Sequence, residues 1–169
     1  ERLASRVLHA DGSLRATGDV LAMNTLGQAG LWRHSISGDL PILLVRVIGP
    51  DALPLVRQVL HAQEYWRLKG LRADVVIVNE QPVGYLDETQ TLLVALLDAG
   101  PWRSWRQQPA GAYLLRGDAI TDAERTLLEA VARAVVSGDR GDLGAQLNRP
   151  YPGWTPLPDQ LSVVADPHA

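Results

Sequence analysis

The sequence predicts a small three-layer α/β domain, in which a mainly parallel sheet of about four strands is flanked by helices. Short apolar runs alternate along the chain with segments whose apolar residues recur at helical spacing. The connections between these runs are long enough for crossover helices, which parallel strands require. The chain has 169 residues, of which 46% are hydrophobic and 21% charged, as in an ordinary globular domain. These local patterns leave the order of the strands open.

The first strand and the helix after it have the clearest pattern. Residues 42–48 form a nearly unbroken apolar run, which is typical of a strand buried on both faces. Gly49-Pro50-Asp51 ends the run, and Asp51 is predicted to cap the next helix, with Pro54 in its first turn. Gly70 is predicted to end this helix. Its buried face should carry Leu55, Val59, Ala62 and Trp66.

The second half of the chain continues the alternation. Residues 73–78 and 112–115 are predicted strands, and 86–99 is a predicted helix between them. Its inner face should carry Leu86, Thr89, Leu93 and Leu96. The sequence Thr121-Asp122-Ala123-Glu124 is a capping box, which predicts a helix start. Residues 133–136 are interpreted as a fourth strand in preference to the end of that helix, and 143–147 as a short last helix.

The chain divides into three predicted regions. Residues 1–40 should hold a helix that ends near His9 and a connecting segment, and residues 41–149 the α/β domain. Residues 150–169 are rich in proline and are predicted to be a linker. Both ends look cut, so the chain is expected to be a piece of a larger protein.

Composition and motifs argue against several classes of function. A net charge of −3, with arginines interspersed among acids, predicts no nucleic-acid partner. No apolar run approaches the ~20 residues of a membrane span, so direct membrane insertion is not expected. Cysteine is absent, the four histidines lack metal-ligand spacing, and no phosphate-binding glycine motif occurs. We therefore predict no catalytic residue, no metal and no cofactor within this chain.

Polar residues follow the predicted strands at their carboxyl ends, where ligands usually bind in such sheets. The candidate ligand or interface residues at this edge are Asn79, Glu80, Asp139 and Arg140. Polar groups and glycines there suit an anion or sugar site. They also suit ordinary strand-to-helix turns, which is the interpretation we favour.

A second set of candidates precedes the first strand and should lie at the opposite edge of the sheet. It consists of Trp32, Arg33, Ser37, Gly38 and Asp39. An aromatic ring beside an arginine and an aspartate suits stacking on a sugar or contact with a neighbouring domain. The alternative, which we favour, is a tight turn with Trp32 packed on the sheet.

A third set lies at the end of the first long helix and consists of Glu64, Tyr65 and Arg67. Basic residues at a helix C-terminus also interact favourably with the helix dipole, so a purely structural role explains them well.

Several blocks of the sequence closely resemble the cyclic β-1,2-glucan synthases. The resemblance covers roughly residues 1–149, and its Gly-Asp-Leu-Pro and Glu-Tyr-Trp-Arg blocks are specific. At His34-Ser35 the chain departs from the pattern, because a small or aromatic residue followed by glycine is expected there. The blocks are residues 26–32, 36–42, 55–58, 64–71, 79–80 and 137–141, with Leu143, Gln146 and Leu147.

The resemblance implies a place for this chain in a very large bacterial inner-membrane protein. Such synthases elongate a glucan from UDP-glucose at a membrane glycosyltransferase and adjust its length in a C-terminal region related to cellobiose phosphorylase. The matching segment lies in the cytoplasmic half of these proteins, near a β-sandwich and the phosphorylase-like barrel. These neighbouring domains, and β-1,2-glucan itself, are the expected partners. The barrel carries the catalytic acid, so no catalytic residue transfers to this chain.

The leading hypothesis is a non-catalytic accessory domain that positions the sandwich and barrel and contacts the glucan. The alternative is an autonomous sugar- or phosphate-binding module that uses the carboxyl ends of the strands. A third hypothesis, a small α/β enzyme, lacks a nucleophile–base pair in the sequence.

Overall fold

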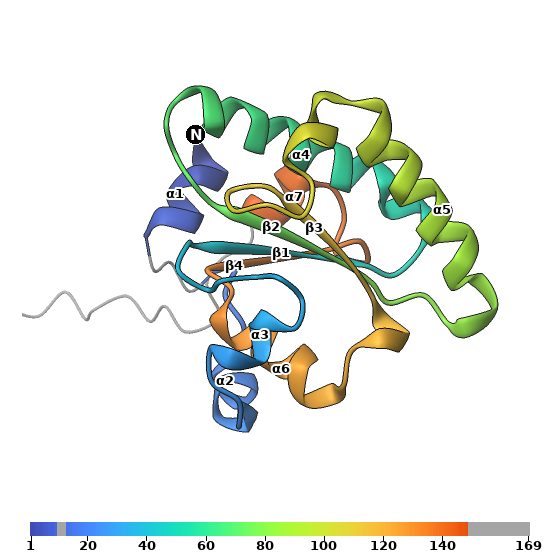
Figure 1. Ribbon diagram of the computed structural model, residues 1–169. Helices are drawn as coiled ribbons and strands as arrows, with labels where there is room; N and C mark the ends of the chain where they lie inside the picture. Colours follow the sequence, from blue (N-terminus) through green and yellow to red (C-terminus); the bar gives the residue numbers. More distant parts are fainter. Residues whose placement is uncertain (10–12, 149–169) are drawn as a thin grey trace, which may run out of the picture.

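The sheet of this chain contains four parallel strands in the order β3-β2-β1-β4. The computed structural model describes residues 1–9 and 13–148 (Figure 1). The predicted α/β class with a parallel sheet is confirmed, including the fourth strand. The strands are β1 (Ile42–Val47), β2 (Asp74–Asn79), β3 (Ala112–Arg116) and β4 (Ala134–Ser137).

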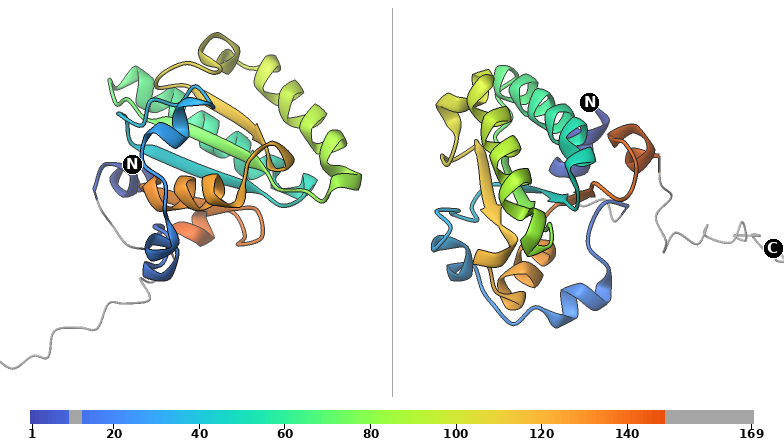
Figure 2. Two further views of the ribbon diagram at one scale, coloured as in Figure 1. Left: turned by 60° about the horizontal axis from the view of Figure 1, so that its bottom comes forward. Right: turned by 90° about the vertical axis from the view of Figure 1, so that its right-hand side faces the viewer.

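Helices cover both faces of the sheet and make three layers, as Figure 2 shows from two further directions. One face carries α1 (Arg2–Leu8), α4 (Leu53–Leu68), α5 (Val83–Ala99), the 3₁₀ helix η2 (Pro101–Trp105) and α7 (Leu143–Leu147). The other face carries α2 (Gly18–Met23), α3 (Ala29–Trp32) and α6 (Asp122–Val131). Short 3₁₀ turns, η1 (Pro50–Ala52) and η3 (Gly117–Ala119), follow β1 and β3.

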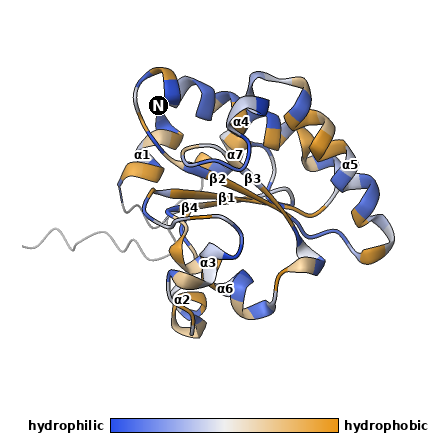
Figure 3. Cartoon of the chain, viewed as in Figure 1, coloured by the Kyte–Doolittle hydropathy of each residue, from blue (hydrophilic) through white to orange (hydrophobic). Residues whose placement is uncertain are grey.

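The strands are apolar on both sides because both faces of the sheet are covered. On β1, Leu43 and Val45 pack beneath α4, whereas Ile42 and Leu44 face α3 and α6. Figure 3 shows the strands as the most hydrophobic layer of the molecule. Full burial of one such side chain contributes about 1.5–3 kcal/mol, so the unbroken apolar runs place the main core at the sheet.

The helix α4 buries the face that the sequence predicts and ends just before Gly70, as expected. Val59 and Trp66 are buried on its inner face. Gly70 has a φ of 78°, a left-handed conformation that glycine adopts readily. The N–H of Leu71 then donates to the carbonyl of Trp66, which closes the end of the helix.

The start of α4 differs from the prediction. Its N-cap is Ala52, and no side chain caps the helix, so the prediction that Asp51 is the cap is wrong. The turn η1 intervenes, with the N–H of Ala52 donating to the carbonyl of Gly49. Pro50 and Pro54 have no backbone N–H, so a capping side chain would have fewer donors to bind here.

The later helices agree with the sequence more closely. The helix α5 begins at Val83, directly after Pro82, rather than near residue 86. The predicted capping box of α6 is confirmed, because the Glu124 N–H donates to Thr121 Oγ1 and the Thr121 N–H donates to the Glu124 carboxylate. On α5, Leu97 is buried where Leu96 was expected, and Leu96 is partly buried.

The N-terminal segment packs against the core of the sheet. Leu3, Val7 and Leu14 are buried beside α4 and the strands. The N–H of Val135 on β4 donates to the carbonyl of Leu14 at 2.6 Å. The division at residue 40 stays a prediction. Part of the turn predicted at residues 11–13, and the predicted linker at 150–169, lie outside the described residues.

Candidate functional site

The carboxyl edge of the sheet has its switch in strand order between β1 and β4. Phosphates often bind in such positions at the start of the helix that follows the first strand. Here Pro50 and Pro54 supply no N–H donors at that helix start, and Asp51 adds a negative charge. Gly138 packs so closely that a Cβ there would lie 2.5 Å from the Cβ of Ala52. The geometry of this switch point therefore disfavours an anion.

Several charged side chains at this edge pair with one another. Glu80 accepts from Arg46 on β1 and from Arg125 on α6, each at 2.9 Å. A second carboxylate, Glu129, lies 3.8 Å from Arg46. The side chain of Glu80 is only 7% exposed. The predicted candidate Glu80 is thus the centre of an internal ion-pair network.

The other candidates at the carboxyl edge are also held by local contacts. Asn79 is fully buried and donates its amide to the carbonyl of Leu86 and to Gln90 on α5. Asp139 accepts from the hydroxyl of Ser137, and this hydrogen bond lowers the pKa of Asp139. Arg140 is exposed in the same turn. These contacts support a structural role for Asn79, in fixing α5 against β2.

The amino edge carries a different arrangement, formed by α3 and the loop that joins it to β1. We call it the Trp32 shelf (Gln28, Trp32, Ser37, Gly38 and Asp39). Trp32 is 62% exposed, so the expectation that it packs on the sheet is wrong. Its indole N–H donates to the carbonyl of Ser37 at 3.3 Å. The amide of Gln28 donates to the same carbonyl and to Asp39 Oδ1 at 2.9 Å. The Ser37 carbonyl and Gln28 therefore connect an exposed indole with the carboxylate of Asp39.

Beside the shelf, the loop is fastened to α6. Arg33 and His34 lie 2.9 and 3.3 Å from Glu124 Oε1. The Thr121 N–H, and to a smaller extent Arg33, lower the pKa of Glu124. The positive charge of Arg33 is therefore paired with Glu124.

Two residues in this loop adopt left-handed backbone conformations. Gly38 has a φ of 79°, and a Cβ there would lie 2.8 Å from the Cγ of Gln28. Ser35 has a φ of 64°, which is uncommon for a residue with a side chain. Glycine was expected at position 35 from the resemblance, and the left-handed φ explains that expectation. Serine keeps the turn at the cost of some strain.

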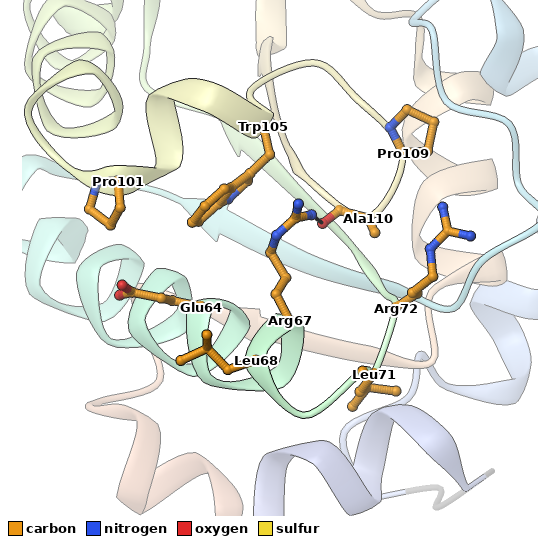
Figure 4. A pocket seen from close by; sticks show the side chains of 10 residues that line it. Glu64, Arg67, Leu68, Leu71, Arg72, Pro101, Trp105, Pro109 and Ala110 are labelled. Atoms are coloured by element: carbon orange, nitrogen blue, oxygen red, sulfur yellow. Dashed lines mark hydrogen bonds between the residues drawn. The ribbon is translucent and has the colours of Figure 1, made fainter.

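A pocket lies at the amino edge on the opposite face of the sheet, between α4 and η2 (Figure 4). Its volume is about 560 Å³. We call it the α4–η2 pocket. Of the candidates at the end of α4, Glu64 and Arg67 line it, whereas Tyr65 is not among the lining residues. The pocket is lined by Glu64, Arg67, Leu68, Gly70, Leu71, Arg72, Pro101, Trp105, Pro109 and Ala110.

Polar side chains hold the far wall of this pocket. Arg67 Nη1 donates to the carbonyl of Ala110 at 2.5 Å, and its Cζ stacks 4.5 Å from the ring centroid of Trp105. Gln63, which is buried, donates to the carbonyls of Ala110 and Gly111. Asp74 Oδ1 accepts from the Ala110 N–H at 2.8 Å. The wall is therefore preorganised by three elements that are distant in sequence.

Asp74 is the most unusual ionisable group near these sites. It is fully buried, and its Oδ2 has no hydrogen-bond partner in the described part of the chain. Burial raises the pKa of Asp74, and the Ala110 N–H opposes this only partly. Burial and the Asp74 carboxylate together raise the pKa of Tyr113 to about 12.

Asp74→Asn should therefore change how stability depends on pH. The folded state holds the Asp74 proton more tightly than the unfolded state, so wild-type stability falls as pH rises from the unfolded-state pKa through the raised folded-state pKa. Asparagine keeps an oxygen for the Ala110 N–H and does not ionise. Urea unfolding from pH 3 to 8 should show wild type losing stability relative to the variant as the pH rises. A wild-type-to-variant difference that stays constant over this range would contradict the prediction.

Sequence reasoning missed most of the pocket. Arg72, Trp105 and Ala110 line it, and none of them is among the candidates that the sequence predicts. A usable signal was the pair Trp102 and Trp105 in a segment bounded by Pro101 and Pro109. The sequence does not show that this segment contacts Arg67, because Arg67 and Ala110 are 43 residues apart along the chain.

Two further properties concern the described residues as a whole. In residues 1–9 and 13–148, no three histidine, aspartate or glutamate side chains converge as metal ligands. Within the same residues, no helix combines the length and hydrophobicity that crossing a membrane requires.

Comparison with known proteins identifies a similarity to a much larger enzyme. No protein-family model matches the chain. The chain is 29% identical over 150 residues to the cyclic β-(1,2)-glucan synthase NdvB of Rhizobium meliloti (strain 1021). The match covers 88% of this chain but only 5% of that protein. The similarity supports the relationship that the sequence blocks predict, between this chain and a short segment of a cyclic β-(1,2)-glucan synthase.

Proposed function

We propose that this chain is a non-catalytic α/β domain of a cyclic-glucan-synthase-like carbohydrate enzyme, and that its Trp32 shelf contacts the glucan. The exposed, fixed indole of Trp32 is the observation that carries this proposal. Sugars bind by stacking their C–H faces on an aromatic ring while polar neighbours accept from their hydroxyls. The shelf supplies both, because Asp39 lies beside Trp32 through the shared contacts of Gln28.

The accessory role is supported by the extent of the similarity and by the surface of α5. The related segment is a small part of its protein, so the remaining domains of such an enzyme would be this domain's partners. We propose a β-sandwich and a phosphorylase-like barrel as those partners, on the cytoplasmic side of a membrane-anchored protein. Val83, Tyr85 and Leu92 are exposed on α5 and would be covered in such an assembly.

The glucan contact can be tested by ¹H–¹⁵N correlation spectra of the 169-residue chain during titration with linear β-1,2-gluco-oligosaccharides. The Trp32 indole N–H signal and the amides of residues 37–39 should shift and saturate. Trp32→Ala should abolish the response yet stay folded, because Trp32 contributes little to the core. Tyr85→Ala is the matched control, since Tyr85 is 64% exposed on the opposite face and should leave the titration unchanged.

Two results would oppose the proposal. Spectra that do not change with oligosaccharide would remove the glucan contact. Saturable shifts that survive in Trp32→Ala, or that cluster around Asn79 and Asp139, would instead favour the alternative of a module using the carboxyl ends of the strands.

A further inference from the structure

We propose that the α4–η2 pocket is a second binding site, for a sugar-sized molecule that carries one phosphate or carboxylate group. The site is separate from the Trp32 shelf, because it lies on the other face of the sheet. The proposal goes beyond the glucan contact and does not depend on it.

The first support is the supply of free cationic donors at one end of the pocket. An arginine presents five N–H donors, and Arg67 spends one nitrogen on the carbonyl of Ala110. Arg72 makes no side-chain hydrogen bond or ion pair with any residue in the described part of the chain, although its charge lowers the pKa of Asp74. Both guanidinium groups line the same cavity, and Figure 4 shows Arg72 at the end of it near Pro109. Guanidinium groups bind the oxygens of phosphates and carboxylates well, so the end of the pocket at Arg72 suits an anionic group.

The second support is the character of the remaining walls. Leu68, Leu71 and Pro109 are apolar, and Trp105 offers ring carbons with a buried Nε1 that has no partner within the described residues. These walls suit the C–H surface of a ring more than a free inorganic ion. A carboxylate, Glu64, lies away from Arg72, near Pro101 (Figure 4), where it can accept from hydroxyl groups. The pocket is thus polarised to fit an anion at one end and a polyhydroxylated body at the other.

The third support is the rigidity and strain of the wall. Gln107 and Ala110 both have a φ of 57°, which residues with side chains rarely adopt. The buried Gln63 and Asp74 hold the loop in this form through its backbone. Strained backbone that is held by buried polar groups is concentrated at binding sites, because it fixes the geometry before the ligand arrives.

The test is isothermal titration calorimetry of the 169-residue chain with four probes. Glucose 6-phosphate and glucuronate carry the two proposed anionic groups on a ring. Glucose supplies the ring without the charge, and inorganic phosphate the charge without the ring. At least one anionic sugar should bind saturably and roughly ten-fold more tightly than glucose and inorganic phosphate. Which of them binds identifies the preferred group.

Variants show whether the pocket is responsible. Arg72→Gln should weaken binding of the anionic sugar roughly ten-fold with little change in the thermal unfolding of the chain, because Arg72 is exposed and interacts with Asp74 only through its charge. Arg57→Gln is the matched control, since Arg57 is exposed on the outer side of α4, away from the pocket. Trp32→Ala should leave this binding intact, which separates this test from that of the glucan contact.

Several outcomes would overturn the proposal. Glucose binding as tightly as the anionic sugars would show that the arginines are not used. Inorganic phosphate binding as tightly would show that the ring is not recognised. An equal loss in Arg57→Gln and Arg72→Gln would indicate unspecific attraction to a basic surface. The absence of saturable binding by both anionic sugars would exclude the site.

Discussion

Gly111→Ala should lower the free energy of unfolding by about 3 kcal/mol or more, the largest effect we expect from one added methyl group in this chain. A Cβ at this position would lie 1.8 Å from the carbonyl oxygen of Trp105 and 2.7 Å from that of Gln108. Both are backbone atoms, so no side-chain rotation relieves the clash. The loop before β3 would have to move, and the hydrogen bond from Gln63 to the Gly111 carbonyl would weaken. Urea unfolding followed by circular dichroism measures the change.

Gly84→Ala is the appropriate control for this effect. Gly84 lies in the first turn of α5, and a Cβ there would meet nothing within 4 Å. Alanine is favoured over glycine in helices, so this variant should keep or raise stability, by up to about 1 kcal/mol. Equal losses in Gly84→Ala and Gly111→Ala would show that the crowding around Gly111 is not the cause.

Glu80→Gln should destabilise the chain by roughly 2–3 kcal/mol. The carboxylate is almost fully buried and neutralises two guanidinium groups, those of Arg46 and Arg125. Glutamine keeps the shape of the side chain but removes its charge. The positive charges of Arg46 and Arg125 would then lose the carboxylate that both of them contact. Removing one partner of a buried ion pair costs about 3–5 kcal/mol, and the partial exposure of both arginines reduces this value. Equilibrium unfolding in urea at pH 7 is the measurement.

An exposed ion pair in the same region provides the comparison. Asp87 lies 2.7 Å from Arg116 and is 83% exposed. Asp87→Asn should leave stability nearly unchanged, because solvent screens exposed pairs. If Glu80→Gln were equally neutral, the network at the carboxyl edge would contribute no stability. A double-mutant cycle of Glu80→Gln with Arg125→Gln then reports the coupling of the pair directly.

The strands and long helices were predictable because their signals are local. The apolar run at 42–48 and the capping box at Thr121 are each defined by a few adjacent residues. The order of the strands was not predictable, because it depends on which apolar run pairs with which across the whole chain. The prediction for the start of α4 is wrong because Asp51 lies within the short turn η1, and α4 begins only after that turn.

The candidate sites were predictable only in part, for a similar reason. Trp32 and Asp39 are close in the sequence, and Gln28 and the Ser37 carbonyl connect them in the structure. The exposure of Trp32 was not predictable, because it depends on how α3 packs against α6. The pocket joins Arg67 to Ala110, and the strained loop that carries Ala110 leaves no clear mark in the sequence.

The hydrogen bond between Leu14 and Val135 determines how the chain can be shortened. The strand β4 is at the border of the sheet, and unpaired border strands invite pairing with a second molecule. The segment around Leu14 occupies that border by accepting from the Val135 N–H. A version of the chain that starts at residue 41 would lose this cover together with the buried Leu3 and Val7. Such a truncated version would aggregate through β4, even though every strand of the sheet is retained.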